Sequence, residues 1–133
     1  TRPWQHVLEP LSGYLVLAQN LYQFPGKYAE GWNFGPFDED AKSVDWILNH
    51  MVNQWPGSSW HLDDNAHPHE AGYLKLDISK AKSRLNWHPT WRLEQTLERI
   101  VTWHQAWLNK QDMQTICLNE INEYMRCMFN EDR

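Results

Sequence analysis

Residues 4–22, WQHVLEPLSGYLVLAQNLY, indicate a short strand that leads directly into a helix. The stretch from Trp4 to Val7 is aromatic and β-branched, as is typical of a strand. From Pro10 onward, apolar residues recur at helical spacing. The proline lies in the first turn, where its missing N–H does not weaken the helix. These residues therefore predict one strand and helix unit of an α/β fold.

The same order repeats further along the chain. Residues 30–36 predict a second short strand, bracketed by glycines and ended by Pro36. Ser43 is a suitable cap for a helix that closes at Pro56-Gly57. Beyond this point we expect short strands at 60–62 and 73–76. Three helices should follow, beginning after Ser79, at Leu93 and after Asp112, with the left-handed residue Asn86 closing the first of them. The pattern indicates the end of an open α/β sheet in residues 1–57 and a smaller α+β lobe in residues 58–133.

Composition limits the class of protein. The 133 residues are enough for one domain with a real core. A net charge of -5 and no Lys/Arg cluster argue against nucleic acid or an anionic membrane as partner. No apolar run approaches the roughly 20 residues of a membrane span, and no signal peptide opens the sequence, so we expect a cytoplasmic protein. Cys117 and Cys127 should lie roughly 15 Å apart on one helix, too far for a disulfide.

The sequence opens on Thr1-Arg2-Pro3-Trp4 without an initiator methionine and enters a strand at once. We therefore expect a piece of a larger protein. Catalytic motifs are also missing from it. There is no Gly-x-Gly-x-x-Gly turn, no phosphate loop, no Gly-x-Ser-x-Gly elbow and no Tyr-x-x-x-Lys pair. The residues offer contacts for a ligand but no catalytic set.

The clearest candidate for a ligand site is the loop that precedes the strand at 73–76. It contains His67, His69 and Glu70 around a proline. A histidine could donate a hydrogen bond to a phosphate, and Glu70 could accept from sugar or base groups. A zinc site that adds His61 and Asp63 is the alternative, but this is not a recognised zinc spacing. Contacts to a polar ligand are therefore the preferred interpretation.

Two further residues could join such a site. Arg2 is either a surface charge or a bidentate clamp for phosphate, because a guanidinium supplies a fork of donors and this acidic chain has few other cations. Asn33 stands at the glycine-flanked end of the second predicted strand. Its amide could face a ligand or only support a turn.

Residues 2–14, 30–36 and 68–77 closely resemble the C-terminal part of the CDP-glucose 4,6-dehydratases, a family of extended short-chain dehydrogenase/reductases. The likeness continues through Ser79-Lys80-Ala81, residues 85–89 and Asp112-Met113. It implies an α/β fold in which residues 1–57 are the C-terminal strand-helix units of a Rossmann-like sheet. Residues 58–133 would be the substrate-binding lobe with the C-terminal helices.

The resemblance also implies an activity. It indicates a lyase that oxidises CDP-glucose at C4 with bound NAD, removes water across C5 and C6, and returns the hydride at C6. The product, CDP-4-keto-6-deoxyglucose, would enter deoxysugar and O-antigen lipopolysaccharide biosynthesis. NAD and the catalytic residues would belong to an N-terminal half that this sequence does not contain. The piece alone should therefore be inactive, and the complete enzyme should be a homo-oligomer.

Individual roles follow from the same resemblance. Arg2 matches an arginine that contacts the diphosphate, and Asn33 matches an asparagine turned toward the nucleotide. His67 stands where relatives carry a second phosphate-facing arginine. The substrate-binding set is Arg2, Asn33, His67, His69, Glu70 and Tyr73. Asn86 in place of a glycine and Arg92 in place of a capping Ser or Thr concern only helix ends.

A different class of function stays open at this stage. The chain could be a free-standing nucleotide-sugar binding or interaction module that lacks catalysis. An upstream reading frame that encodes the glycine-rich turn would distinguish the enzyme from the module.

Overall fold

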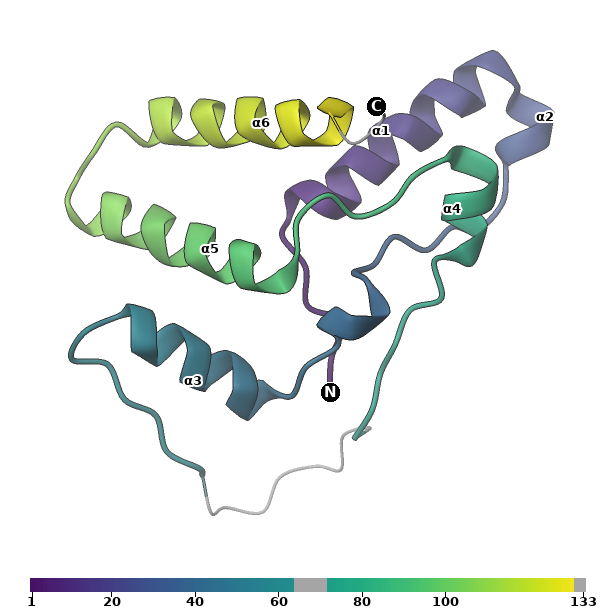
Figure 1. Cartoon of the computed structure of the whole chain (residues 1–133). Coiled ribbons are helices and arrows are strands. Elements are labelled where there is room, and N and C mark those ends of the chain that lie inside the picture. The colour runs from purple at the N-terminus through teal and green to yellow at the C-terminus, as the bar shows by residue number, and fades with distance from the viewer. Residues whose placement is uncertain (64–71, 131–133) are drawn as a thin grey trace.

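The computed structural model describes residues 1–63 and 72–130 (Figure 1). Three helices, α3, α5 and α6, lie side by side, and α1 crosses the end of α6 with α2 and α4 beyond it. Their bounds are α1 Leu8–Gln23, α2 Pro25–Tyr28, the 3-10 turn η1 Asp38–Asp40, α3 Val44–Gln54, α4 Ser79–Leu85, α5 Leu93–Leu108 and α6 Met113–Asn130. In this part of the chain no helix is both long and apolar enough to cross a membrane.

The strands predicted at 4–7, 30–36, 60–62 and 73–76 are not found in the described residues. Most of these residues run without regular structure, and Val7 instead begins the turn into α1. One isolated antiparallel bridge joins Arg2 to Lys42. A strand exists only through a ladder of hydrogen bonds to a neighbouring strand, and these segments offer one another few such bonds. The structure therefore does not confirm the Rossmann-like sheet or the α+β lobe.

The helices, in contrast, agree with the periodicity of the sequence. Asp112 caps α6, because its Oδ1 accepts a hydrogen bond from the Gln114 N–H at 3.1 Å. Asn86 closes α4 in the left-handed conformation with φ of 51°. The cap expected at Ser79 is wrong, because Ser79 is the first residue of α4 and Ile78 occupies the N-cap position. Asp77 Oδ1 accepts from the Ser79 N–H at 2.8 Å, because a carboxylate competes well for an N-terminal donor.

One core cluster joins α1 to α4 through the segment that contains Phe34. The Phe34 ring lies edge-on to Trp87 with centroids 4.9 Å apart. It also presses on Gly13, where an added Cβ would lie 2.3 Å from the ring. Only glycine allows this close approach of helix and ring. The buried members of the cluster are Tyr28, Phe34, Ile78, Ala81, Leu85 and Trp87.

A second cluster packs α3 against α5. Ile47 from α3 meets Leu93 and Leu97 from α5, and all three are buried. Trp4 packs against the cluster and donates its indole N–H to the Lys42 carbonyl at 3.0 Å. The N-terminal segment is thereby fixed to the loop before α3.

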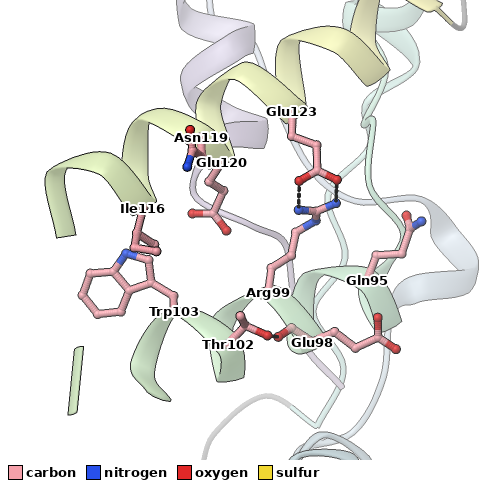
Figure 2. Close-up of a pocket in the computed structure, with 9 residues that line it drawn as sticks. All are labelled: Gln95, Glu98, Arg99, Thr102, Trp103, Ile116, Asn119, Glu120 and Glu123. Atoms are coloured by element: carbon pink, nitrogen blue, oxygen red, sulfur yellow. Dashed lines mark hydrogen bonds and ion pairs between the residues drawn. The ribbon is translucent and has the colours of Figure 1, made fainter. Parts of the chain in front are cut away.

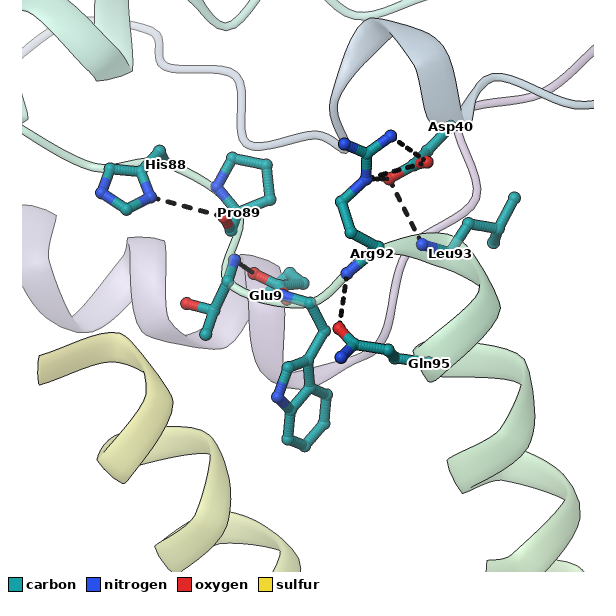
Figure 3. A network of polar contacts seen from close by, with 9 residues as sticks. Glu9, Asp40, His88, Pro89, Arg92, Leu93 and Gln95 are labelled. Carbon is teal, nitrogen blue, oxygen red and sulfur yellow. Dashed lines mark hydrogen bonds and ion pairs between the residues drawn. The ribbon is translucent and has the colours of Figure 1, made fainter. Parts of the chain in front are cut away.

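The carboxylate of Glu9 connects the helices, although the side chain is only 1% exposed. Oε2 accepts hydrogen bonds from the Thr90 N–H at 2.9 Å and the Tyr124 hydroxyl at 2.7 Å. Oε1 accepts from the Trp91 N–H at 2.8 Å. Figure 3 shows the carboxylate against the linker that leads into α5. A buried carboxylate is tolerated when donors surround it in this way.

A second buried carboxylate, Asp40, organises the start of α5 (Figure 3). Its Oδ2 accepts a hydrogen bond from Arg92 Nε at 2.9 Å, and its Oδ1 accepts one from Arg92 Nη2 at 3.0 Å. Oδ2 also accepts from the Leu93 N–H at 3.2 Å. The guanidinium of Arg92 cannot accept hydrogen bonds from the N–H groups of the first turn. It binds Asp40, 52 residues earlier in the chain, and this carboxylate accepts a hydrogen bond in its place. This explains how an arginine is accommodated at the helix start.

Replacing Glu9 with alanine is expected to lower the free energy of unfolding by about 3–5 kcal/mol, because buried N–H and hydroxyl donors lose their acceptor. Urea unfolding followed by tryptophan fluorescence measures the change. The matched control is Glu94→Ala, an exposed acid, which should shift stability by less than about 0.5 kcal/mol. Equal effects of the two substitutions would contradict the role given to Glu9.

Candidate functional site

Residues 72–78 form an extended segment that touches both the N-terminus and the segment after Asn33. The Thr1 ammonium group donates to the Gly72 carbonyl at 2.8 Å, and the Leu74 N–H donates to the Thr1 carbonyl at 3.1 Å. At the other end, the Asn33 side-chain amide donates to the Asp77 carbonyl at 3.3 Å. Three distant parts of the sequence therefore converge here.

Arg2 lies within this convergence and is half-buried. Its backbone N–H donates to the Lys42 carbonyl at 3.2 Å, and its Nη1 donates to the Thr1 carbonyl at 3.0 Å. The Gln5 amide donates to the Phe34 carbonyl at 3.1 Å, which holds the N-terminal segment against the segment after Asn33. These hydrogen bonds fix the position of the Arg2 backbone, from which its side chain extends.

The structure thus brings together the segments that carry three of the six predicted binding residues, Arg2, Asn33 and Tyr73. The other three, His67, His69 and Glu70, lie outside the described residues. Asn33 and Tyr73 are exposed, although the Asn33 amide nitrogen already donates to the Asp77 carbonyl. No finding tests the binding role of any of the six, and all six stay predictions.

Next to Tyr73, the structure reveals a small charged cleft of 330 Å³. Lys75 Nζ lies 3.3 Å from Asp38 Oδ2 and 5.9 Å from the centre of the Tyr73 ring. Hydrogen bonds to Tyr73 and then to Asp38 raise the pKa of Lys75 above its usual value. The cleft is lined by Asp38, Lys75, Leu76, Asp77, Ile78, Ser79 and Lys82. Asp38 and Lys75 lie 37 residues apart, so no local sequence pattern predicts this contact.

The described residues contain no candidate metal site. Across 1–63 and 72–130, no group of three or more His, Cys, Asp or Glu side chains is placed to hold an ion. His61 and Asp63 are exposed. The remaining members of the zinc alternative, His67 and His69, fall outside the description.

A hollow of 410 Å³ lies between α5 and α6 (Figure 2). Its polar wall is occupied by an ion pair in which Arg99 donates to both oxygens of Glu123, at 2.9 and 2.8 Å. The same guanidinium stacks 3.9 Å from the centre of the Trp91 ring. Because Nη1 and Nη2 bind Glu123 and one face of the guanidinium packs on Trp91, Arg99 joins the two helices.

His6 lies close to Trp91 and Arg99 and is 6% exposed. Its ring stands edge-on to Trp91 with centroids 5.0 Å apart, and its Nδ1 accepts from the Leu8 N–H at 3.3 Å. Burial, and then the nearby Arg99 charge, lower the pKa of His6 to about 4. Glu120 lies 3.6 Å from Nε2 and would favour a protonated ring, but burial raises the pKa of Glu120 as well. The ring is therefore neutral at pH 7.

The lowered pKa of His6 predicts that stability falls between pH 6.5 and about 4. In this window the unfolded chain binds a proton on His6 that the folded chain does not, so the free energy of unfolding decreases as pH falls. The contribution is roughly 2–3 kcal/mol. The raised pKa of Glu120 acts in the opposite direction, and variants are needed to separate the two.

Urea unfolding at several pH values measures this dependence. His6→Phe keeps an aromatic ring that cannot be protonated, so its stability should decline less steeply between pH 6.5 and 4. His104→Phe, at an exposed histidine, is the control and should keep the steeper decline. If His6→Phe and the unaltered chain have the same slope, the proton is not taken up at His6.

Comparison with known proteins addresses identity. No family model matches the chain. The chain is 59% identical over 125 residues to the CDP-glucose 4,6-dehydratase of Salmonella typhimurium. The match covers 93% of this chain and lies in the C-terminal portion of the relative. The chain spans about a third of that protein, 35% of its length. The resemblance to the C-terminal portion of CDP-glucose 4,6-dehydratase is thereby confirmed.

Proposed function

We propose that this chain is the substrate-binding C-terminal portion of an enzyme that converts CDP-glucose to CDP-4-keto-6-deoxyglucose and water. The observation that carries the proposal is the 59% identity, which extends over 93% of the chain. Because the similarity extends over nearly all of the chain, it favours the interpretation that the chain is part of this enzyme. No separate observation supports a free-standing binding module.

The substrate contacts belong to the convergence around residues 72–78. Arg2 supplies a positive charge suited to a diphosphate, and Asn33 supplies an exposed amide suited to nucleotide groups. Tyr73 lies between Gly72 and Leu74, the two residues that contact Thr1, and is 61% exposed. His67, His69 and Glu70 directly precede this segment in sequence. We assign these six residues to binding the CDP-sugar and none of them to catalysis.

NAD does not fit the residues of this chain. A dinucleotide needs a glycine-rich turn at a helix start, so that the backbone can approach the diphosphate. Here a Cβ added to Gly13 would lie 2.3 Å from the Phe34 ring, and one added to Gly35 would lie 3.0 Å from the Cβ of Leu76, so side chains fill the space beside both glycines. Neither glycine opens a cradle. We therefore assign the cofactor and the catalytic residues to an N-terminal portion, and no step of the reaction to this chain.

The remaining features of the proposal follow from the enzyme as a whole. The complete protein would act in the cytoplasm as a homo-oligomer, in deoxysugar and O-antigen biosynthesis. The boundary near residue 57, between the strand-helix units and the substrate-binding lobe, is part of the same proposal.

The full-length protein is expected to convert CDP-glucose in the presence of NAD to a product lighter by one water, detected by mass spectrometry. UDP-glucose, with the same sugar, serves as the matched control and should react more slowly. The 133-residue chain alone should give no product. A full-length protein that binds CDP but forms no product would favour the binding module instead.

Arg2→Ala is expected to weaken binding of CDP to the full-length protein by about 1.5–3 kcal/mol, because a charge-assisted contact to the diphosphate is lost. Isothermal titration calorimetry measures the dissociation constant. Arg126→Ala, which removes an exposed arginine from α6, is the control and should leave it unchanged. An unchanged constant for Arg2→Ala would remove Arg2 from the site.

A further inference from the structure

Tyr73 and Lys75 form a pair on one side of the extended segment 72–78. Side chains two residues apart in an extended chain point to the same side. Lys75 Nζ lies 5.9 Å from the centre of the Tyr73 ring, and the lysine hydrogen-bonds to the Tyr73 hydroxyl. The tyrosine is 61% exposed, whereas the side chain of Lys75 is 35% exposed. The tyrosine is therefore the more accessible member of the pair.

The direction of this hydrogen bond follows from the chemistry of the two groups. A lysine ammonium has three donors and no acceptor, so Nζ donates and the phenolic oxygen accepts. Hydrogen bonds to Tyr73 and then to Asp38 raise the pKa of Lys75, so the ammonium is charged at pH 7. A phenol that accepts in this way keeps its own hydrogen for another acceptor. The Tyr73 hydroxyl is therefore set to donate to a ligand.

Asp38 orients the lysine from a distant part of the chain. Its Oδ2 lies 3.3 Å from Lys75 Nζ, and it is the first residue of η1, the 3-10 turn before α3. The side chain of Asp38 is 74% exposed. Ion pairs that are this open to water contribute little to the stability of a protein. The pair therefore directs the ammonium group toward Tyr73 without being needed to hold the fold together.

A hydroxyl donor with a cation behind it suits an anionic oxygen. The ammonium polarises the phenol, and this makes the outward O–H group a stronger donor. Hydrogen bonds are stronger when one partner is ionised, and phosphate oxygens are charged acceptors. The hydroxyl groups of a sugar are neutral and can donate as well as accept, so they gain less from this arrangement. The diphosphate is therefore the part of a CDP-sugar that best fits Tyr73.

We propose that Lys75, oriented by Asp38, is a positioning residue that fixes the Tyr73 hydroxyl as a donor to a phosphate oxygen of CDP-glucose. The inference rests on the proposed function, which places Tyr73 in the substrate-binding set. It adds to that set a residue that acts through Tyr73 and does not contact the substrate itself. The direction of the Tyr73 hydrogen bond, and not only its presence, then determines affinity for the diphosphate.

The test is a double-mutant cycle on the full-length protein, with CDP binding measured by isothermal titration calorimetry. Tyr73→Phe should raise the dissociation constant roughly tenfold, because a hydrogen bond to a charged oxygen is lost. Lys75→Met should raise it by roughly three- to tenfold, and adding this change to Tyr73→Phe should cause no further increase. Lys75→Arg keeps a cationic donor and should restore most of the affinity.

Lys82→Met is the matched control, because it removes the same charge from the same cleft. Lys82 Nζ lies 5.6 Å from the centre of the Phe37 ring and is not part of the Asp38, Lys75 and Tyr73 contacts. This variant should leave the dissociation constant unchanged. Thermal unfolding without nucleotide is the structural control. Tm of Lys75→Met should stay within roughly 2 °C of the unaltered protein, since only an exposed ion pair is lost.

Independent, additive effects of Lys75→Met and Tyr73→Phe would mean that the lysine binds the substrate directly, and would overturn the proposal. An unchanged dissociation constant in either single variant, an equal effect of Lys82→Met, or a large fall in Tm of Lys75→Met would also overturn it. Product formation is measured separately. A full-length protein that binds CDP but forms no product would therefore count against the proposed function and not against the role of Lys75.

Discussion

The buried carboxylate of Glu9 is the constraint on which the rest of the structure depends. Its donors lie 81, 82 and 115 residues further along the chain, so one side chain connects α1, the linker before α5 and α6. A carboxylate in this position is stable only when its lone pairs are filled. The three segments therefore have to be correctly placed together, and this requirement favours a single arrangement over looser packing of the same apolar residues.

The candidate site depends on this arrangement although Glu9 is not part of it. Once α1 is fixed, Gly13 holds Phe34, and Phe34 sets the position of the neighbouring Asn33. Trp87 packs on the same ring and donates its indole N–H to Ser12 at 2.9 Å. The chain segments at 2–5, 33–36 and 72–78 can be irregular and still hold defined positions, because helices on either side of them are fixed.

Local signals predicted the helices and long-range contacts could not be predicted. The periodicity of α1, the left-handed Asn86 and the Asp112 cap are all encoded within a few residues. The strands were wrong because alternating residues indicate an extended backbone, whereas a strand also needs a partner. The pairings of Glu9 and of Asp40 span more than fifty residues and have no sequence pattern. The prediction that Arg2 and Asn33 bind a ligand rested partly on resemblance. The position of Lys75 in a charged cleft depends on its contact with Asp38, which only the structure shows.

Glu9 also explains why α1 presents one particular face outward. A helix that is apolar on all sides could pack in several rotations of similar energy, as loosely specified cores do. A single buried charge removes this freedom, since only one rotation brings the carboxylate to the Thr90, Trp91 and Tyr124 donors. That rotation turns Leu15 and Tyr22 away from the core. The polar anchor on one side of α1 thus determines which apolar side chains the opposite side exposes.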